Sequence, residues 1–202
     1  MSDSGWRGSV LKYIRAEALP VDKYGHQPRL YALTQAIGRG LEYDDDVVFA
    51  AAWMHDLGVF AGHRPADPAA LARWNHVPYT VARSRELLAE WGFPAEKLDA
   101  VAEAIRTHQP QDRPATLEAT ILRDADILEQ LGAVGAVRAL VKVGRDTRYA
   151  TVSAVLPVLK KAVDELPGKL ELPRARELAV EKVASLRAFV AALEAEAGEH
   201  LH

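Results

Sequence analysis

The feature that most constrains this chain is the regular interruption of helix-forming sequence by proline and glycine. Between the interruptions the chain is rich in Ala, Leu, Glu and Arg, which have high helix propensity. Alternating β-branched runs of strand length and internal repeats are missing from the sequence. The pattern therefore predicts an all-α fold. We expect helices, with errors of a few residues at each end, over residues 6–18, 26–40, 44–57, 77–91, 95–108, 115–143, 147–166 and 173–197.

The C-terminal part of the chain is predicted to be a long amphipathic helix. The length of 202 residues suits one domain, and we expect a single compact unit. The segment ARELAVEKVASLRAFVAALEAEAG carries apolar residues near helical spacing, with Glu and Arg between them. We expect this helix either to pack back on the domain or to pair with a second copy of the chain in a homodimer. Its apolar positions are Leu178, Val183, Leu186, Phe189, Val190 and Leu193.

Three consecutive aspartates mark the start of a further helix. Asp44–Asp46 precede the apolar pair Val47 and Val48. Carboxylates are favoured at this position because the first N–H groups of a helix are unpaired and its dipole is positive there. The helix that leads to His55 and Asp56 is therefore predicted to begin at this cluster.

Composition excludes several classes of protein. The formal charge is −3 and the basic residues are scattered, so nucleic acid is not an evident partner. There is no cysteine, and the N-terminus has neither a long apolar run nor a small-residue cleavage site, so we expect a cytoplasmic protein without a membrane partner. The sequence has no G-x-S-x-G, Walker, H-E-x-x-H, cysteine-based zinc or dinucleotide motif.

Histidines recur on the inward faces of the predicted helices. His55 follows Val48 by seven residues and lies on the apolar stripe of its helix. His108 ends an apolar stripe that starts at residue 98, and His26 and His76 each open an amphipathic helix. A buried imidazole needs a polar partner, and four such rings exceed what core packing normally requires.

A shared metal ion accounts for these histidines together. Taken singly, His55 is more simply a hydrogen-bonded core residue, and Asp56 a helix-end residue. The adjacent imidazole and carboxylate of His55 and Asp56 can chelate one divalent ion, provided that further ligands converge from elsewhere in the chain. The combination, and not the dipeptide, therefore predicts a metal site.

Four segments resemble the HD phosphohydrolases in their order and spacing. The resemblance spans about residues 20–140 and is closest to small stand-alone bacterial HD proteins. It implies one HD domain over residues 1–202, a multi-helix bundle on which C-terminal helices of about residues 145–197 pack. The segments are HQPRLYALTQAI, LEYDDDVVFAAAWMHDLG, IRTH and ILRDADILEQLGAVGAVRAL.

The resemblance implies four metal ligands. In the family these are a histidine, the His-Asp pair and a late aspartate, which correspond here to His26, His55, Asp56 and an aspartate of RDADIL. We choose Asp126, because the family's late motif has Ala-Asp followed two positions on by an apolar residue. Helical periodicity instead favours Asp124, which remains an alternative ligand or a residue that supports one.

Five further residues are candidates for the same site. His76 and His108 correspond to extra histidines that hold a second metal or grip substrate phosphate in some family members, and core packing explains them equally well. Arg29 lies one turn after His26 at a recurrent family position, where a guanidinium could bind two phosphate oxygens. His63 and Arg64 lie in the loop after the His-Asp pair and could line the mouth of the site.

The function implied is hydrolysis of a phosphate ester or anhydride, with a nucleotide as the expected substrate. A divalent ion (Mn²⁺, Co²⁺, Ni²⁺, Mg²⁺, Fe²⁺ or Zn²⁺) would activate a water and neutralise phosphate charge. One alternative is a dinuclear iron oxygenase of the same superfamily, although lysines that would grip its substrate have no counterpart here. The other is a catalytically silent metal-binding module.

Overall fold

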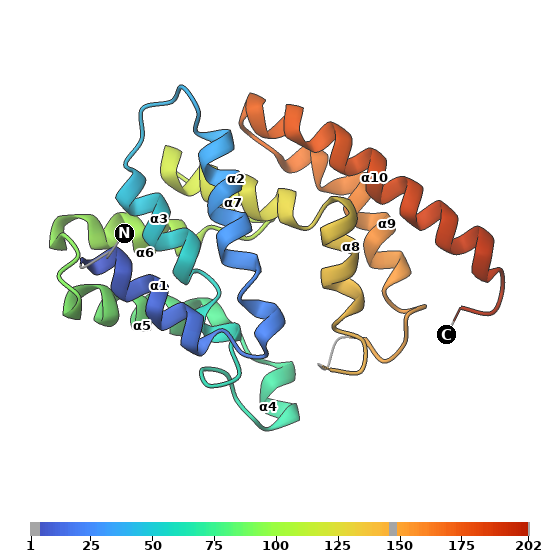
Figure 1. Cartoon of the computed structure of the whole chain (residues 1–202), viewed down its shortest axis with the longest axis horizontal. Coiled ribbons are helices and arrows are strands. Elements are labelled where there is room, and N and C mark those ends of the chain that lie inside the picture. The colour runs from blue at the N-terminus through green and yellow to red at the C-terminus, as the bar shows by residue number, and fades with distance from the viewer. Residues whose placement is uncertain (1–4, 146–148, 202) are drawn as a thin grey trace. The chain divides into compact units, whose positions relative to one another are not determined.

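The computed structural model describes residues 5–145 and 149–201. These residues form a succession of helices joined by turns and loops (Figure 1). No strand occurs in these residues, which confirms the all-α prediction. The helices form two units, Met1–Ala125 and Asp126–His202. The bounds are α1 (Trp6–Glu17), η1 (Val21–Lys23), α2 (His26–Ile37), α3 (Asp45–Met54), η2 (Leu57–Val59), α4 (Pro68–Ala72), α5 (His76–Glu90), η3 (Ala95–Lys97), α6 (Leu98–Arg106), α7 (Leu117–Glu129), α8 (Gly132–Leu140), α9 (Leu156–Glu165), η4 (Pro167–Lys169) and α10 (Pro173–Ala197).

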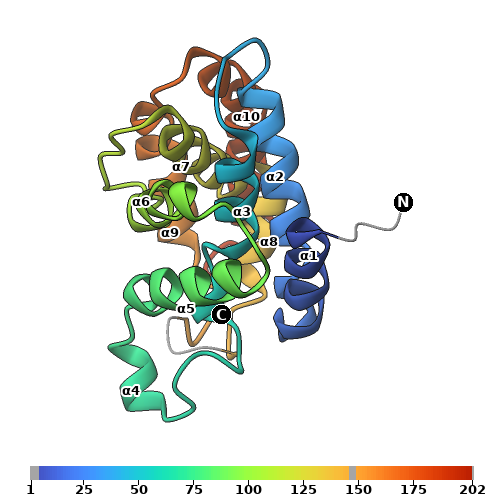
Figure 2. The ribbon, with the colours of Figure 1, turned by 90° about the vertical axis from the view of Figure 1, so that its left-hand side faces the viewer.

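Helix α3 is the centre of the first unit. It is apolar around most of its circumference, and every residue from Val47 to Met54 is buried. A helix of this composition must be surrounded by others, and α3 packs against α1, α2 and α6. Figures 1 and 2 both show α2 and α3 side by side. The residues that end α3 are therefore delivered into the interior of the unit.

The predicted start of α3 is confirmed. Asp44 is the N-cap, and its carboxylate accepts hydrogen bonds from the backbone N–H groups of Asp46 and Val47. Asp45 and Asp46 occupy the first turn, where they complement the helix dipole. The α-helix then ends at Met54, three residues before the predicted end, and the short helix η2 follows the His-Asp pair.

The aspartate cluster also joins three elements of the first unit. The Arg7 guanidinium of α1 lies 2.7 Å from Asp46 Oδ1 and 2.8 Å from Asp45 Oδ2. The Lys97 ammonium of η3 lies 2.9 Å from Asp46 Oδ2 and 2.8 Å from Asp44 Oδ2. The hydrogen bond from Arg7 is the main cause that holds the pKa of Asp46 below its ordinary value, and Lys97 adds to it against the opposing effect of burial.

Replacing Asp46 by asparagine is expected to destabilise the fold by about 1 kcal/mol near neutral pH, as for other half-exposed ion pairs. The pKa of Asp46 is lower in the folded than in the unfolded chain, so its contribution is complete above about pH 4 and is lost as the pH falls through the folded-state pKa. Urea unfolding at pH 7 and pH 3 measures this. The gap between wild type and D46N should shrink at pH 3, and an equal gap at both values would contradict the prediction.

Two predicted long helices differ in the structure. The predicted helix over 115–143 is two helices, α7 and α8, because the chain turns at Gly132, whose φ is +78°. A Cβ atom at Gly135 would overlap the Gln130 carbonyl, so the turn is close-packed. The predicted helix over 147–166 begins only at Leu156, and residues 147 and 148 of that range lie outside the described residues. Helix α4 was not predicted.

The second unit is held together by α10. This helix packs against α8 and α9, and Leu186 and Val190 of its predicted apolar stripe are buried. No helix among the described residues is both long enough and apolar enough to cross a membrane. Pairing of α10 with a second copy of the chain, and the single-domain arrangement, stay predictions.

Candidate metal centre

Two imidazoles and a carboxylate meet where α2 begins and α3 ends. His26 is the first residue of α2, His55 caps the end of α3, and Asp56 follows it. The Nε2 atoms of His26 and His55 are 3.2 Å apart. Asp56 Oδ2 lies 3.7 Å from the first and 3.6 Å from the second. Three donor atoms from two parts of the chain thus lie within 4.8 Å of one another.

Backbone carbonyls orient two of the histidine rings. The Nδ1 atom of His55 lies 3.0 Å from the Ala52 carbonyl oxygen, and that of His108 lies 2.7 Å from the Ile105 carbonyl oxygen. A carbonyl can only accept, so each Nδ1 carries the proton and donates it. Each ring is thereby held by its Nδ1 atom, as in metal-binding histidines, whose non-ligating ring nitrogen is commonly bonded to a carbonyl or a carboxylate.

A second group of donors shares the same carboxylate. Asp56 Oδ1 lies 3.5 Å from His76 Nε2, and His108 completes a group in which all donor atoms lie within 4.8 Å of one another. The ring of His108 is 5.0 Å from that of His55 and 5.5 Å from that of His76, centre to centre. The four predicted inward histidines are therefore contiguous, and Asp56 presents one oxygen to each group.

The charge state of Asp56 follows from these neighbours. Burial opposes ionisation of its carboxyl group, but the imidazoles of His55 and His26, followed by those of His76 and His108, outweigh it and hold the pKa of Asp56 well below its ordinary value. The side chain is also 22% exposed. Asp56 is thus an anion at neutral pH that solvent can still reach.

The residues fit a divalent cation. Two ligand atoms that each lie about 2.1 Å from one ion at a tetrahedral angle are about 3.4 Å apart. The three separations among His26 Nε2, His55 Nε2 and Asp56 Oδ2 run from 3.2 to 3.7 Å, on either side of that value. Mixed imidazole and carboxylate donors suit Mn²⁺, Fe²⁺, Co²⁺, Ni²⁺ and Zn²⁺.

The two candidate late aspartates have different local environments on α7. Asp124 is fully buried. Asp126 is half-buried, and its Oδ2 accepts a hydrogen bond of 3.2 Å from the Gln130 side-chain amide. Hydrogen bonds of this kind orient carboxylate ligands. The choice of Asp126 stays a prediction, and Asp124 stays the alternative.

Of the remaining predicted residues, Arg29 lies on α2, whereas His63 and Arg64 lie in the loop after the His-Asp pair. Arg29 is half-buried on the first turn of α2. Its guanidinium lies against Gly25, where a Cβ atom would be 2.9 Å from Arg29 Nη1. His63 is engaged by its neighbours: Nε2 lies 3.3 Å from Glu17 Oε2 and Nδ1 lies 2.8 Å from the Tyr79 hydroxyl. Both ring nitrogens of His63 thus contact residues outside the two donor groups. Arg64 is half-buried in the same loop.

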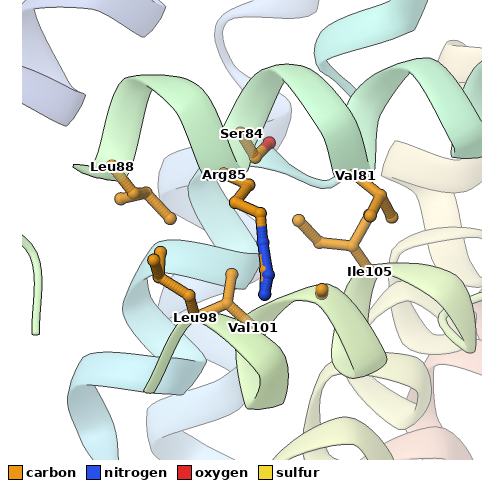
Figure 3. Close-up of a pocket in the computed structure, with 8 residues that line it drawn as sticks. Val81, Ser84, Arg85, Leu88, Leu98, Val101 and Ile105 are labelled. Atoms are coloured by element: carbon orange, nitrogen blue, oxygen red, sulfur yellow. The ribbon is translucent and has the colours of Figure 1, made fainter. Parts of the chain in front are cut away.

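A small apolar pocket between α5 and α6 includes no member of the two donor groups. Val81 and Leu88 of α5 face Val101 and Ile105 of α6, and the Arg85 side chain extends between the two helices (Figure 3). The Arg85 guanidinium pairs with an aspartate, Asp99, at the start of α6. These contacts join α5 to α6, which carry His76 and His108 at or next to their ends.

The sequence reasoning did not single out Gly58, Trp74 or Thr80, although all three contact the turn after Asp56. Gly58 N–H donates to Thr80 Oγ1 over 3.0 Å, and the Gly58 carbonyl accepts from Trp74 Nε1 over 2.8 Å. A glycine two residues after the His-Asp pair was a visible signal. Nothing in the spacing of Trp74 or Thr80 pointed to this contact, because it forms across 16 and 22 residues.

Solved structures share this fold over nearly the whole chain. Bacillus subtilis YpgQ is 24% identical, with a TM-score of 0.73 over 96% of this chain and 97% of its own. YpgQ in complex with ADP is likewise 24% identical, with a TM-score of 0.71 over 96% of each chain. A predicted HD superfamily hydrolase from an uncultured Thermotogales bacterium is 23% identical, with a TM-score of 0.63 over 94% of this chain and 92% of its own.

Similarity of fold at this level of identity does not show the family of the chain, whereas a match to a family model does. No curated protein matches the chain. The model of the HD domain matches residues 24–131, more than half of the chain. That range contains both donor groups, including the adjacent pair His55 and Asp56, together with the two candidate late aspartates on α7. The chain therefore belongs to the HD-domain family.

Proposed function

We propose that this protein is a metal-dependent phosphohydrolase that cleaves a phosphate ester or anhydride of a nucleotide. The observation that carries the proposal is the convergence of His26 Nε2, His55 Nε2 and Asp56 Oδ2 within 3.7 Å of one another. When bound, a divalent ion supplies a water of lowered pKa and neutralises phosphate charge. Asp126 is the proposed fourth ligand, and Asp124 its alternative.

The chain's own residues would position the reaction. Asp56 stays ionised, so its charge attracts a cation without first having to lose a proton at neutral pH. The Ala52 carbonyl holds the His55 ring by its Nδ1 atom and so orients its Nε2 atom. We assign Arg29 to a phosphate of the substrate, because a guanidinium can bind two phosphate oxygens at once. His76 and His108 would hold either a second ion or a substrate phosphate.

The nucleotide substrate is inferred from a structural relative. YpgQ has been solved in complex with ADP, and its fold matches this chain over 96% of both chains. At 24% identity this supports a nucleotide as the first class of substrate to test, and it does not choose among nucleotides.

The test uses the full chain, stripped of metal by a chelator and then supplied with Mn²⁺, Co²⁺, Ni²⁺ or Mg²⁺. Release of phosphate or pyrophosphate from nucleoside mono-, di- and triphosphates is compared with hydrolysis of generic phosphate esters. Hydrolysis that needs the added ion and prefers nucleotides is expected. Metal binding without hydrolysis of any substrate would instead indicate a catalytically silent module.

A dinuclear iron oxygenase is the second candidate, because Asp56 faces two donor groups and could serve two ions. This alternative predicts two tightly bound irons and consumption of O₂. The phosphohydrolase can also hold two divalent ions, but it does not consume O₂. An oxygen electrode therefore separates the two functions.

A further inference from the structure

The turn after Asp56 is held from two directions. Gly58, at the middle of η2, donates its N–H to Thr80 Oγ1 and accepts from the Trp74 indole through its carbonyl. Thr80 is fully buried in α5, and Trp74 comes just before that helix. We call Gly58, Trp74 and Thr80 the Gly58 clamp. Both backbone polar groups of Gly58 are thus bound by side chains in or just before α5.

Only glycine permits this approach. A Cβ at Gly58 would lie 2.9 Å from the His76 carbonyl oxygen, 3.0 Å from His76 Cβ and 3.0 Å from Thr80 Oγ1. The nearest of these atoms belongs to the backbone, so the first turn of α5 would have to move away. The turn that carries Asp56 therefore lies closer to His76, the first residue of α5, than a residue with a Cβ atom at position 58 would allow.

The same approach sets the geometry of the second donor group. His76 Nε2 lies 3.5 Å from Asp56 Oδ1, whereas Asp56 Oδ2 faces His26 and His55. Asp56 is two residues before Gly58, and His76 is four residues before Thr80. A shift between η2 and α5 would change the distance from Asp56 Oδ1 to His76 directly. The distances from Oδ2 to His26 and His55 do not involve α5.

We infer that the Gly58 clamp is a positioning device that sets Asp56 and His76 at the separation needed to hold a second divalent ion beside the first. This inference rests on the proposed function, since it presupposes that the first ion binds at His26, His55 and Asp56. The clamp residues do not touch the reacting atoms. They act through Asp56 and His76.

The test is titration of the chelator-stripped full chain with Mn²⁺ alone, by calorimetry and electron paramagnetic resonance. The key variant is Thr80→Val, which keeps the shape of the side chain but removes the acceptor of the Gly58 N–H. The second equivalent of Mn²⁺ is expected to bind about tenfold more weakly, as when other groups that orient metal ligands are removed. The first equivalent should bind as in wild type, and the spin-coupled signal of the ion pair should be lost at low Mn²⁺.

Two further variants separate positioning from general destabilisation. Thr80→Ser keeps the hydroxyl and should restore the second equivalent. Trp74→Phe keeps an aromatic ring at a half-exposed position but removes the indole N–H that Gly58 accepts from. This variant should weaken the second equivalent even if Thr80→Val does not fold. Circular dichroism reports whether each variant is folded.

The outcomes bear on different claims. Wild-type binding of both equivalents by Trp74→Phe and by folded Thr80→Val would overturn the inference. A wild-type protein that binds a single equivalent would overturn it as well, because the clamp would have no second ion to position, but would leave a single-ion hydrolase standing. Failure of the wild type to bind Mn²⁺, Co²⁺, Ni²⁺ or Mg²⁺ at all would instead remove the proposed function.

Discussion

Replacing His55 by alanine is expected to abolish tight metal binding and phosphate release together. His55 Nε2 lies 3.2 Å from His26 Nε2 and 3.6 Å from Asp56 Oδ2, so its loss leaves one imidazole and one carboxylate of the first donor group. Metal affinity should fall by more than the ~100-fold that follows loss of a group which merely orients a ligand. Hydrolysis at a fixed low metal concentration should fall about 1,000-fold or more, since removal of even one charge-stabilising donor lowers rates about 100- to 1,000-fold.

The matched control is His63→Ala, which also removes a largely buried imidazole from the first unit. His63 contacts Tyr79 and Glu17 instead of the donor groups. This variant should lower the melting temperature and leave metal affinity unchanged. Calorimetric titration with Mn²⁺ and an assay of phosphate release compare the two variants. Equal losses of metal affinity in both variants, or none in His55→Ala, would contradict the assignment of His55.

The second large effect is expected at the late aspartate. Asp126→Asn keeps the size of the side chain and the acceptor for the Gln130 amide but removes the negative charge. If Asp126 is the fourth ligand, metal affinity should fall about 100-fold, since a neutral amide is a weaker ligand than a carboxylate and even orienting groups contribute 10- to 100-fold. Hydrolysis should fall in parallel and recover in part at high metal concentration.

Asp124→Asn is the matched variant on the same helix. Asp124 is fully buried, and a buried carboxylate must be compensated by its surroundings, so removal of its charge should lower the melting temperature. Metal affinity should stay near that of wild type. The reverse pattern, with metal affinity lost in Asp124→Asn and retained in Asp126→Asn, would transfer the ligand role to Asp124.

Much of the fold could be predicted because it follows from local sequence. The cap at Asp44 and the all-apolar run that makes α3 the central helix need only the chain within a few residues of them. The break between α7 and α8 was missed. Ala, Leu, Val and Arg continue the helical pattern through residues 117–140, while the positive φ of Gly132 and the close contact of Gly135 with Gln130 end it. The sequence alone does not show whether a glycine inside a helical pattern stays within the helix or ends it.

The sequence by itself determined that four histidines face inward and that His55 and Asp56 end a buried helix, since a 3.6-residue period assigns each side chain to a face. Only the tertiary structure decided which atoms meet. It placed Asp56 Oδ2 toward His26 and His55 and Oδ1 toward His76, and it tied His63 to Tyr79 and Glu17. The physical reason is how far apart along the chain the interacting residues lie. Periodicity is a property of neighbours along the chain. Apart from the adjacent pair His55 and Asp56, these contacts join residues 16 to 46 positions apart, whose separation depends on how whole helices pack.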